Sequence, residues 1–202
     1  MRTVATGSPS DIEIAPPPRI DGESVRLRPV STEDYGYLQD LFSEVHPLAH
    51  SRLRGATPPP DEFVDALWHG VMVQFVIERR DRREPHGLIS AVAANLRDGF
   101  VHLELTTRRE ELSSGPTGEA VSLFVAYLFR VWPLRKIYLD VAQFNLTDFR
   151  QATAVPFVEE ARLKGHEFQD GRYWDVHVLA VYRSASEADA GVVAAAAASE
   201  DR

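Results

Sequence analysis

Three apolar runs in the middle of the chain alternate with polar turns and predict adjacent strands. Residues 71–77 are apolar almost throughout, as expected of a central strand that is buried on both faces. Residues 87–94 and 100–107 follow after a charged turn at 81–86. Arg97-Asp98-Gly99 separates the last two runs, and its glycine can adopt the positive φ angle that a tight hairpin requires. The three runs therefore predict an antiparallel meander.

Before residue 134, three segments have helical spacing, and one of them is long. After a loop at 108–116, apolar side chains recur three and four positions apart and form one continuous face that ends at Pro133. Earlier in the chain, Ser31-Thr-Glu-Asp34 has the residues of a capping box before helical spacing at 35–45, and Asp61 precedes a short helix. The apolar face of the long helix consists of Val121, Phe124, Val125, Leu128, Phe129 and Trp132.

The C-terminal third predicts a strand, a short helix and a hairpin. Residues 136–141 alternate between apolar and polar side chains, and residues 145–153 have helical spacing. Residues 157–168 and 172–182 flank Gln169-Asp170-Gly171, a second hairpin turn.

The predicted order of elements is βααβββαβαββ, starting with a strand at Val25–Leu27 in which apolar residues alternate with arginines. A strand, helix and strand that return to one sheet form a right-handed crossover, and helices then cover both faces of the sheet. Ligands of such sheets bind where strands splay, at the carboxyl ends of strands and the N-termini of helices. The pattern therefore predicts an α/β domain.

The 202 residues suit one domain with a tail at each end. Residues 1–20 are rich in serine and proline, so we expect a disordered N-terminal lead. Residues 185–202 are acidic and contain a short alanine run with little to pack against, so we expect a disordered tail. The domain itself is predicted at residues 21–184.

Composition excludes several classes of function. The chain has no cysteine, which rules out disulfides, a thiol nucleophile and a cysteine-based zinc site. The histidines show no metal-ligand spacing, so no metal cofactor is expected. No apolar run reaches the roughly 18 residues of a membrane span and the N-terminus lacks a signal peptide's apolar core, which predicts a cytoplasmic protein with no membrane partner. The net charge of −8 argues against a nucleic-acid partner.

Five local strings recur here in the order and spacing of a known family. They are Val25-Arg-Leu-Arg-Pro29 with Ser31-Thr-Glu-Asp34, His86-Gly-Leu-Ile-Ser90, Gly118-Glu-Ala120 before the long helix, Asn145 with Phe157, and His166-Glu-Phe-Gln-Asp-Gly-Arg-Tyr-Trp-Asp175. Over about residues 25–182 the chain resembles the RimJ/RimL-like branch of the GNAT N-acetyltransferase superfamily. The resemblance implies the GNAT fold, a central mixed, mostly antiparallel sheet of six to seven strands with helices on both faces.

The resemblance also implies an activity, the transfer of an acetyl or other short acyl group from acetyl-CoA or another acyl-CoA to a primary amine. The acceptor would be a small molecule or a protein N-terminus, and the enzyme a monomer or homodimer. In this family, strand main chain holds the thioester, here at Leu105 and Thr107, and an asparagine, here Asn145, faces the pantetheine arm. Backbone amides bind the CoA pyrophosphate, and they correspond here to Ser113, Ser114, Gly115, Thr117 and Gly118.

The phosphate loop departs from the family pattern Q/R-x-x-G-x-G/A. Aligned on Glu119-Ala120, Glu110 stands at the Gln/Arg position, Ser113 at the first glycine and Gly115 at the second. A carboxylate that faces phosphates is unfavourable, and Pro116 removes one amide donor. Two alternatives follow. One is a GNAT-fold protein that has lost catalysis and works as a binding or regulatory module, and the other is an acyltransferase for an unusual donor, such as succinyl-CoA or a carrier-bound acyl group.

Acyl transfer requires a neutral amine, so a base must remove a proton from the acceptor. His102 and Glu104 lie two residues apart on a predicted strand and hence on one face, and imidazole is suited to proton transfer near neutral pH. The alternative for this pair is a solvated strand face. In the family a general acid for the departing thiolate follows the asparagine. Asp148 stands at that position, where a carboxyl group acts as an acid only when burial favours its protonated form.

Overall fold

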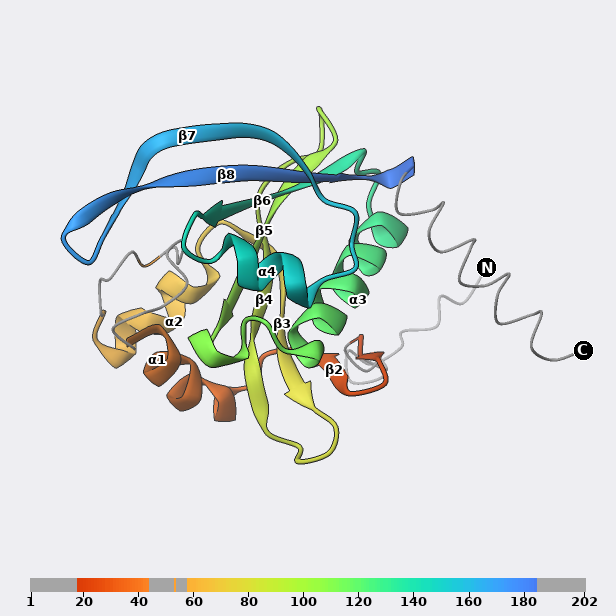
Figure 1. The fold of residues 1–202 in the computed structure, drawn as a ribbon. Helices are drawn as coiled ribbons and strands as arrows, with labels where there is room; N and C mark the ends of the chain where they lie inside the picture. The colour runs from red at the N-terminus through yellow and green to blue at the C-terminus, as the bar shows by residue number, and fades with distance from the viewer. Residues whose placement is uncertain (1–17, 44–52, 54–57, 185–202) are drawn as a thin grey trace, which may run out of the picture.

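The structure, a computed structural model, describes residues 18–43, 53 and 58–184 (Figure 1). Most of the predicted N-terminal lead and all of the predicted tail at 185–202 lie outside these residues. The sheet begins at Ile20, one residue before the predicted domain boundary at 21, because Ile20 pairs with Leu27 and packs against the main core.

Eight strands form one sheet in the described part of the chain, in the order β1-β2-β3-β4-β5-β6-β8-β7. Neighbouring strands are antiparallel except β5 and β6, which are parallel. The sheet exceeds the expected six to seven strands because β1, which is too short to show a pattern, adds to the others. The strands are β1 (Ile20–Asp21), β2 (Val25–Arg28), β3 (Val71–Arg79), β4 (Pro85–Asn95), β5 (Phe100–Thr107), β6 (Lys136–Ala142), β7 (Val158–Gln169) and β8 (Arg172–Tyr182).

Helices cover both faces of the sheet, as the crossover predicts (Figure 1). The 3-10 turn η2 (Thr32–Asp34), α1 (Tyr35–Ser43) and α2 (Pro60–Trp68) lie on one face, and α3 (Gly115–Val131) and α4 (Leu146–Ala152) lie on the other. A second 3-10 turn, η3 (Arg109–Glu111), leads from β5 toward α3. Among the described residues, no helix is long and apolar enough to cross a membrane.

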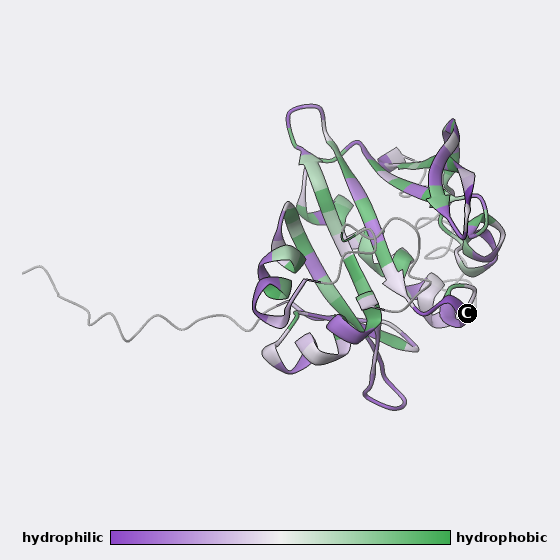
Figure 2. Ribbon diagram, turned by 90° about the vertical axis from the view of Figure 1, so that its left-hand side faces the viewer, coloured by the Kyte–Doolittle hydropathy of each residue, from purple (hydrophilic) through white to green (hydrophobic). Residues whose placement is uncertain are grey.

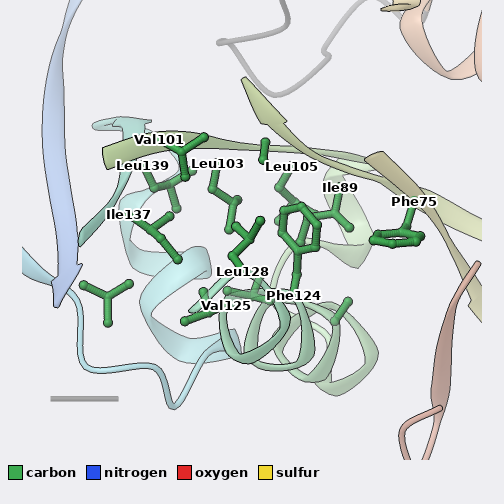
Figure 3. Packing of buried hydrophobic residues seen from close by; sticks show 14 of the residues in the cluster. Phe75, Ile89, Val101, Leu103, Leu105, Phe124, Val125, Leu128, Ile137 and Leu139 are labelled. Atoms are coloured by element: carbon green, nitrogen blue, oxygen red, sulfur yellow. The ribbon is translucent and has the colours of Figure 1, made fainter. Parts of the chain in front are cut away.

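The main core lies between β5 and α3 (Figure 3). Because successive side chains of a strand point to opposite faces, every second residue of β5 faces α3 and leaves His102 and Glu104 on the other side. A fully buried phenylalanine such as Phe124 contributes about 1.5–3 kcal/mol through the hydrophobic effect. The buried side chains of this contact are Val101, Leu103, Leu105, Phe124, Val125 and Leu128.

The middle of strand β3, residues 74–77, is buried on both faces, as its apolar run predicts, whereas residues 71–73 are half-buried. Phe75 and Ile77 belong to the main core, whereas Val76 points to the opposite face. Figure 2 shows hydrophobic residues concentrated along the central strands and hydrophilic residues in the turns at the ends of the sheet. The second core, under α1 and α2, consists of Leu38, Phe42, Phe63, Leu67, Val76 and Leu88.

Helix α3 begins earlier than its apolar spacing indicates. A loop was predicted as far as residue 116, but the helix begins at Gly115. Ser114 is the N-cap residue, and its side-chain oxygen accepts a hydrogen bond from the Thr117 amide. Pro116 lies in the first turn, where a missing amide does not break the helix. The predicted phosphate-binding loop is therefore largely the first turn of a helix.

Arg183 ties the end of the sheet to the end of α3. Its guanidinium group donates to the main-chain oxygens of Leu134 at 2.7 Å, Phe129 at 2.5 Å and Trp132 at 2.6 Å. The bonds to Phe129 and Trp132 satisfy carbonyl groups that the last turn of a helix leaves without partners, and the positive charge complements the helix dipole. The last strand is thus fixed up to the predicted domain boundary.

Candidate active site

Strands β5 and β6 pair at one end and separate toward the other (Figure 1). Beyond the last pair, β5 stays paired with β4 up to Thr107, and β6 stays paired with β8 up to Ala142. The facing main-chain edges therefore diverge over the carboxyl-terminal halves of the strands, where open α/β sheets bind ligands. In the described chain their parallel ladder is Phe100↔Lys136, Val101↔Ile137 and His102↔Tyr138.

Leu105 and Thr107 lie on the separated part of β5. The side chain of Leu105 is buried in the main core. The hydroxyl of Thr107 donates to the main-chain oxygen of His86 at 3.1 Å. Both side chains are thus buried in the protein interior, and the main chain of the two residues forms the edge of β5 that faces β6.

The first turn of α3 is open at Gly115, where a Cβ would meet no atom within 4 Å. Ser113 is exposed beside it, and Glu110 is exposed on η3. Because the Thr117 amide already bonds the Ser114 side chain at 3.4 Å and Pro116 has no amide, this turn offers fewer donors than a glycine-rich loop. The positive end of the helix dipole still favours an anion here.

A buried hydrogen-bond network lies beneath this turn and is centred on the hydroxyl of Thr117. The hydroxyl donates to the main-chain oxygen of Glu111 at 2.7 Å and accepts from the Ser114 hydroxyl at 3.1 Å. The Nε2 atom of His86 lies 2.9 Å from the same oxygen. Because a hydroxyl has one proton and Glu111 receives it, we assign the proton of His86 to Nε2.

Burial lowers the pKa of His86 below its ordinary value of 6.5. Only 2% of the side chain is exposed, and removing an imidazolium from water disfavours the charged form. Glu111, whose Oε2 lies 3.9 Å from Nδ1, opposes this lowering, whereas the charge of Arg79 adds to it. The neutral imidazole therefore holds Thr117 at neutral pH.

Arg109 connects the segments that follow the two separated strands. Its Nη1 atom donates to Asn145 Oδ1 at 3.2 Å, and its guanidinium lies 5.9 Å from the centroid of the Phe144 ring. Asn145 is buried and makes no side-chain cap hydrogen bond to α4, so the contact to Arg109 is what engages its amide oxygen. Arg109 thereby adds a positive charge next to the predicted pantetheine contact.

Gly118 lies directly against α4. A Cβ at this position would come within 1.7 Å of the main-chain oxygen of Ala152. The close approach of α3 and α4 therefore requires glycine at Gly118, and this contact fixes the short helix that begins after Asn145.

His102 and Glu104 share the face of β5 that is turned away from α3, as their spacing predicts. The His102 ring stacks on Tyr138 of β6, with centroids 5.1 Å apart and an interplanar angle of 29°. Asp140, two residues further along β6, places its Oδ2 3.8 Å from His102 Nδ1. On β4, Ser90 is the register partner of Glu104.

The predicted catalytic residues and Asn145 fall into two sets. His102 and Glu104 lie on the face that α1 and α2 partly cover. Asn145 and Asp148 come from the start of α4, which packs with α3 on the other face. The separation between β5 and β6 lies between the two sets.

The sequence did not single out Arg109 or Asp140, and it pointed to His86 only as a member of a family string. Asp140 occupies a polar position of a strand with alternating side chains. The pattern therefore predicted which face of the strand Asp140 lies on, but not that His102 lies beside it. Arg109 follows directly after a strand, but only the fold brings it to Asn145.

No protein-family model matches the sequence, and no curated protein matches it. Solved structures do resemble the fold. Spermidine N-acetyltransferase from Vibrio cholerae, in complex with CoA and spermine, has a TM-score of 0.70 and 22% identity over 81% of this chain and 98% of that chain. A GNAT-family acetyltransferase from Bacillus anthracis has a TM-score of 0.65 and 13% identity over 81% of this chain and 98% of that chain.

These likenesses confirm the predicted GNAT fold. At 22% and 13% identity they establish the fold alone. The RimJ/RimL-like branch and the roles of individual residues stay predictions.

Proposed function

We propose that the protein is an N-acyltransferase that moves an acetyl or other short acyl group from acyl-CoA to a primary amine. The observation that carries the proposal is the end of the β5–β6 ladder at His102↔Tyr138. Past this pair, two strand edges face each other without pairing, and the N-terminus of α3 follows at the same end of β5. An extended thioester arm suits the strand edges, and a pyrophosphate suits the helix start.

The reaction is a direct attack in a ternary complex. Main chain of Leu105 and Thr107 holds the thioester, and His102 or Glu104 removes a proton from the acceptor ammonium. The amine nitrogen then bonds to the thioester carbonyl carbon, and the carbon–sulfur bond breaks. As the bond breaks, the nitrogen loses its second proton to become the amide, and the departing thiolate takes up one proton to become free CoA. Asp148 is the candidate acid that passes this proton to the sulfur.

The CoA moiety is held at the start of α3 and at Asn145. The exposed turn at Ser113–Gly115 offers hydroxyls and the helix dipole to the pyrophosphate, with Thr117 and Gly118 in the same turn. Arg109 supplies a positive charge that offsets the unfavourable carboxylate of Glu110.

The acceptor is an amine that is cationic before it reacts. Asp140 and Glu104 place carboxylates on the His102 side of the sheet, where they attract an ammonium group. Spermine, which is bound in the structure of the Vibrio cholerae enzyme, is a polyamine of this kind. The acceptor screen therefore includes spermidine and spermine together with amino acids, aminoglycosides and peptide N-termini.

Calorimetric titration with acetyl-CoA and succinyl-CoA tests the proposal. We expect micromolar binding of one of them. Gly115→Asp adds a charge at the helix start, and Asn145→Ala removes the amide beside Arg109. Each should weaken binding by about tenfold or more, which corresponds to about 1.4 kcal/mol.

Asn95→Ala is the matched control, because Asn95 bonds Asp98 in the hairpin turn that precedes β5, far from the start of α3. It should leave the affinity unchanged. If the parent protein binds neither acyl-CoA, the proposed enzyme activity is wrong, and carrier-bound donors or protein partners become the candidates.

A second candidate is a GNAT-fold binding or regulatory protein that has lost catalysis. The observation in its favour is the combination of Glu110, Ser113 and Pro116 at the phosphate-binding turn. Acyl-CoA binding without turnover of any screened amine supports this candidate. Turnover that disappears in His102→Gln or Glu104→Gln excludes it.

A further inference from the structure

Three neighbouring side chains surround the imidazole ring of His102 on β5. Tyr138 stacks on its ring at 5.1 Å, and Phe100 meets the ring edge-on at 6.2 Å. The parallel register His102↔Tyr138 places Asp140 next in line on the same face of the sheet. The aromatic contacts restrict the ring plane, and the carboxylate lies beside one of its two nitrogens.

The carboxylate of Asp140 is aimed at the imidazole. Its Oδ2 lies 3.8 Å from His102 Nδ1, within ion-pair range, and both side chains are 33% exposed. Its other oxygen, Oδ1, is buried and has no hydrogen-bond partner among the described residues. Hydrogen bonds of catalytic groups are often long before the substrate binds and shorten in the complex.

We propose that Asp140 is the positioning residue for His102, that it holds the imidazole as the Nδ1–H tautomer, and that His102 Nε2 is therefore the atom that removes the acceptor proton. This inference rests on the proposed function and assigns the base to His102 rather than Glu104. Asp140 itself does not contact the reacting atoms.

The proton balance follows from this assignment. The acceptor ammonium gives one proton to Nε2, and the N–H bond that breaks leaves its electron pair on the amine nitrogen. The imidazole becomes an imidazolium with protons on both nitrogens, and the carboxylate of Asp140 stabilises its positive charge. The neutral amine then attacks the thioester carbonyl carbon, the carbon–sulfur bond breaks, and the departing thiolate takes up the second proton of the nitrogen. The imidazolium finally releases its proton to solvent, which restores the neutral base.

Other charged or titratable groups near this face do not take the place of Asp140. Glu104 lies two residues along the same strand, so it points in the same direction as His102 rather than toward its ring edge. On β4, the register partner of His102 is Val92, which carries no charge. On β7, Glu160 is engaged by Lys136, Tyr138 and Tyr182.

The first test is the tautomer of His102, read from the 15N chemical shifts of its imidazole nitrogens. The His102→Gln spectrum identifies its signals among those of the other histidines. We expect a proton on Nδ1 in the parent protein and a shift toward the Nε2–H form in Asp140→Leu, which has a similar volume and no acceptor. Asp65→Asn removes a carboxylate from the exposed side of α2 and should change nothing.

The second test is kinetic and uses an amine from the screen. Asp140→Leu and Asp140→Asn should lower kcat by about tenfold to 100-fold and leave the KM for acyl-CoA unchanged, since a general base supplies about 10²–10⁴-fold in rate. The double variant His102→Gln/Asp140→Leu should be no slower than His102→Gln alone, because the two residues act as one unit.

The two tests separate failure of this inference from failure of the proposed function. An Nε2–H tautomer of His102 in the parent protein overturns the pairing whether or not an acceptor is known. An Nδ1–H tautomer that stays unchanged in both Asp140→Leu and Asp140→Asn overturns it as well. Additive losses in the double variant overturn it in an active enzyme. If no amine is turned over, the proposed function is wrong, and the tautomer measurement alone then tests whether Asp140 is paired with His102.

Discussion

At the scale of single residues, His86 supports the candidate site from within the protein. It is buried, it bonds Thr117, and Thr117 in turn bonds Glu111 and the N-cap residue Ser114. One imidazole therefore supports the turn that is proposed to bind pyrophosphate. Its lowered pKa links this support to pH, because the folded protein accepts the proton less readily than the unfolded chain.

The free energy of unfolding should therefore fall as the pH decreases below 6.5, where the unfolded chain binds the proton first, and level off below the depressed pKa of folded His86. Urea unfolding between pH 7.5 and about pH 5 measures this slope. His86→Gln keeps a donor for Thr117 but does not titrate, so the slope should flatten. His69→Gln, at an exposed position after α2, is the control. An equal slope in parent and His86→Gln would contradict the assignment.

At the scale of elements, α3 positions both the phosphate-binding turn and α4. The two helices approach so closely that Gly118 has no room for a side chain next to Ala152. A methyl group there must push α4 away, and α4 begins directly after Asn145. The contact between the helices thus sets the position of a residue proposed to bind CoA.

Gly118→Ala should lower the free energy of unfolding by about 1–3 kcal/mol, as overpacking of a close contact does. It should also weaken acyl-CoA binding through the displaced Asn145. Gly36→Ala is the matched control, because a Cβ at Gly36 in α1 meets nothing within 4 Å. Alanine favours helix by up to about 1 kcal/mol over glycine, so this variant should be equal to or more stable than the parent. Urea unfolding measures both, and a fully stable Gly118→Ala protein would contradict the observed packing.

At the scale of the whole molecule, β7 is an edge strand of the sheet and pairs with β8 alone in the described part of the chain. Most side chains of β7 are exposed, and at its tip the exposed rings of Phe168 and Tyr173 meet edge-on. Glu160 of β7 reaches back across β8 and bonds Lys136 at 2.9 Å as well as the hydroxyls of Tyr138 and Tyr182. This carboxylate ties the edge strand to β6.

The hydrogen bond from Tyr182, together with Lys136, lowers the pKa of Glu160 from 4.5 to about 2. A lowered carboxyl pKa stabilises the fold above the unfolded value, and this contribution is lost as the pH falls from 4.5 toward about 2. In Glu160→Gln, this part of the acid dependence should be absent and stability at neutral pH should be lower. Thermal unfolding as a function of pH measures it, with the exposed Glu62→Gln as control. Unchanged behaviour of Glu160→Gln would show that the tie contributes nothing.

Much of the fold could be predicted because its elements have local patterns. The apolar face from Val121 to Phe129 became part of α3, whereas Trp132 follows the end of the helix as its C-cap residue. The turn at Asp170-Gly171 became a hairpin with positive φ angles at both residues. The start of α3 was placed too late, because the signal of a first turn lies in its cap at Ser114 rather than in apolar spacing. The two-residue β1 was missed because a pattern needs more than two positions.

The candidate site was predictable only in part. Sequence spacing alone determined that His102 and Glu104 share a face, since side chains of a strand alternate. Tertiary structure alone decided that Asp140 lies beside His102, that Arg109 reaches Asn145 and that His86 supports Thr117. The physical reason is distance along the chain. Alternation and helical spacing act between near neighbours, whereas these three contacts join residues more than 30 positions apart. Such residues come together only when the sheet forms and the chain buries its core.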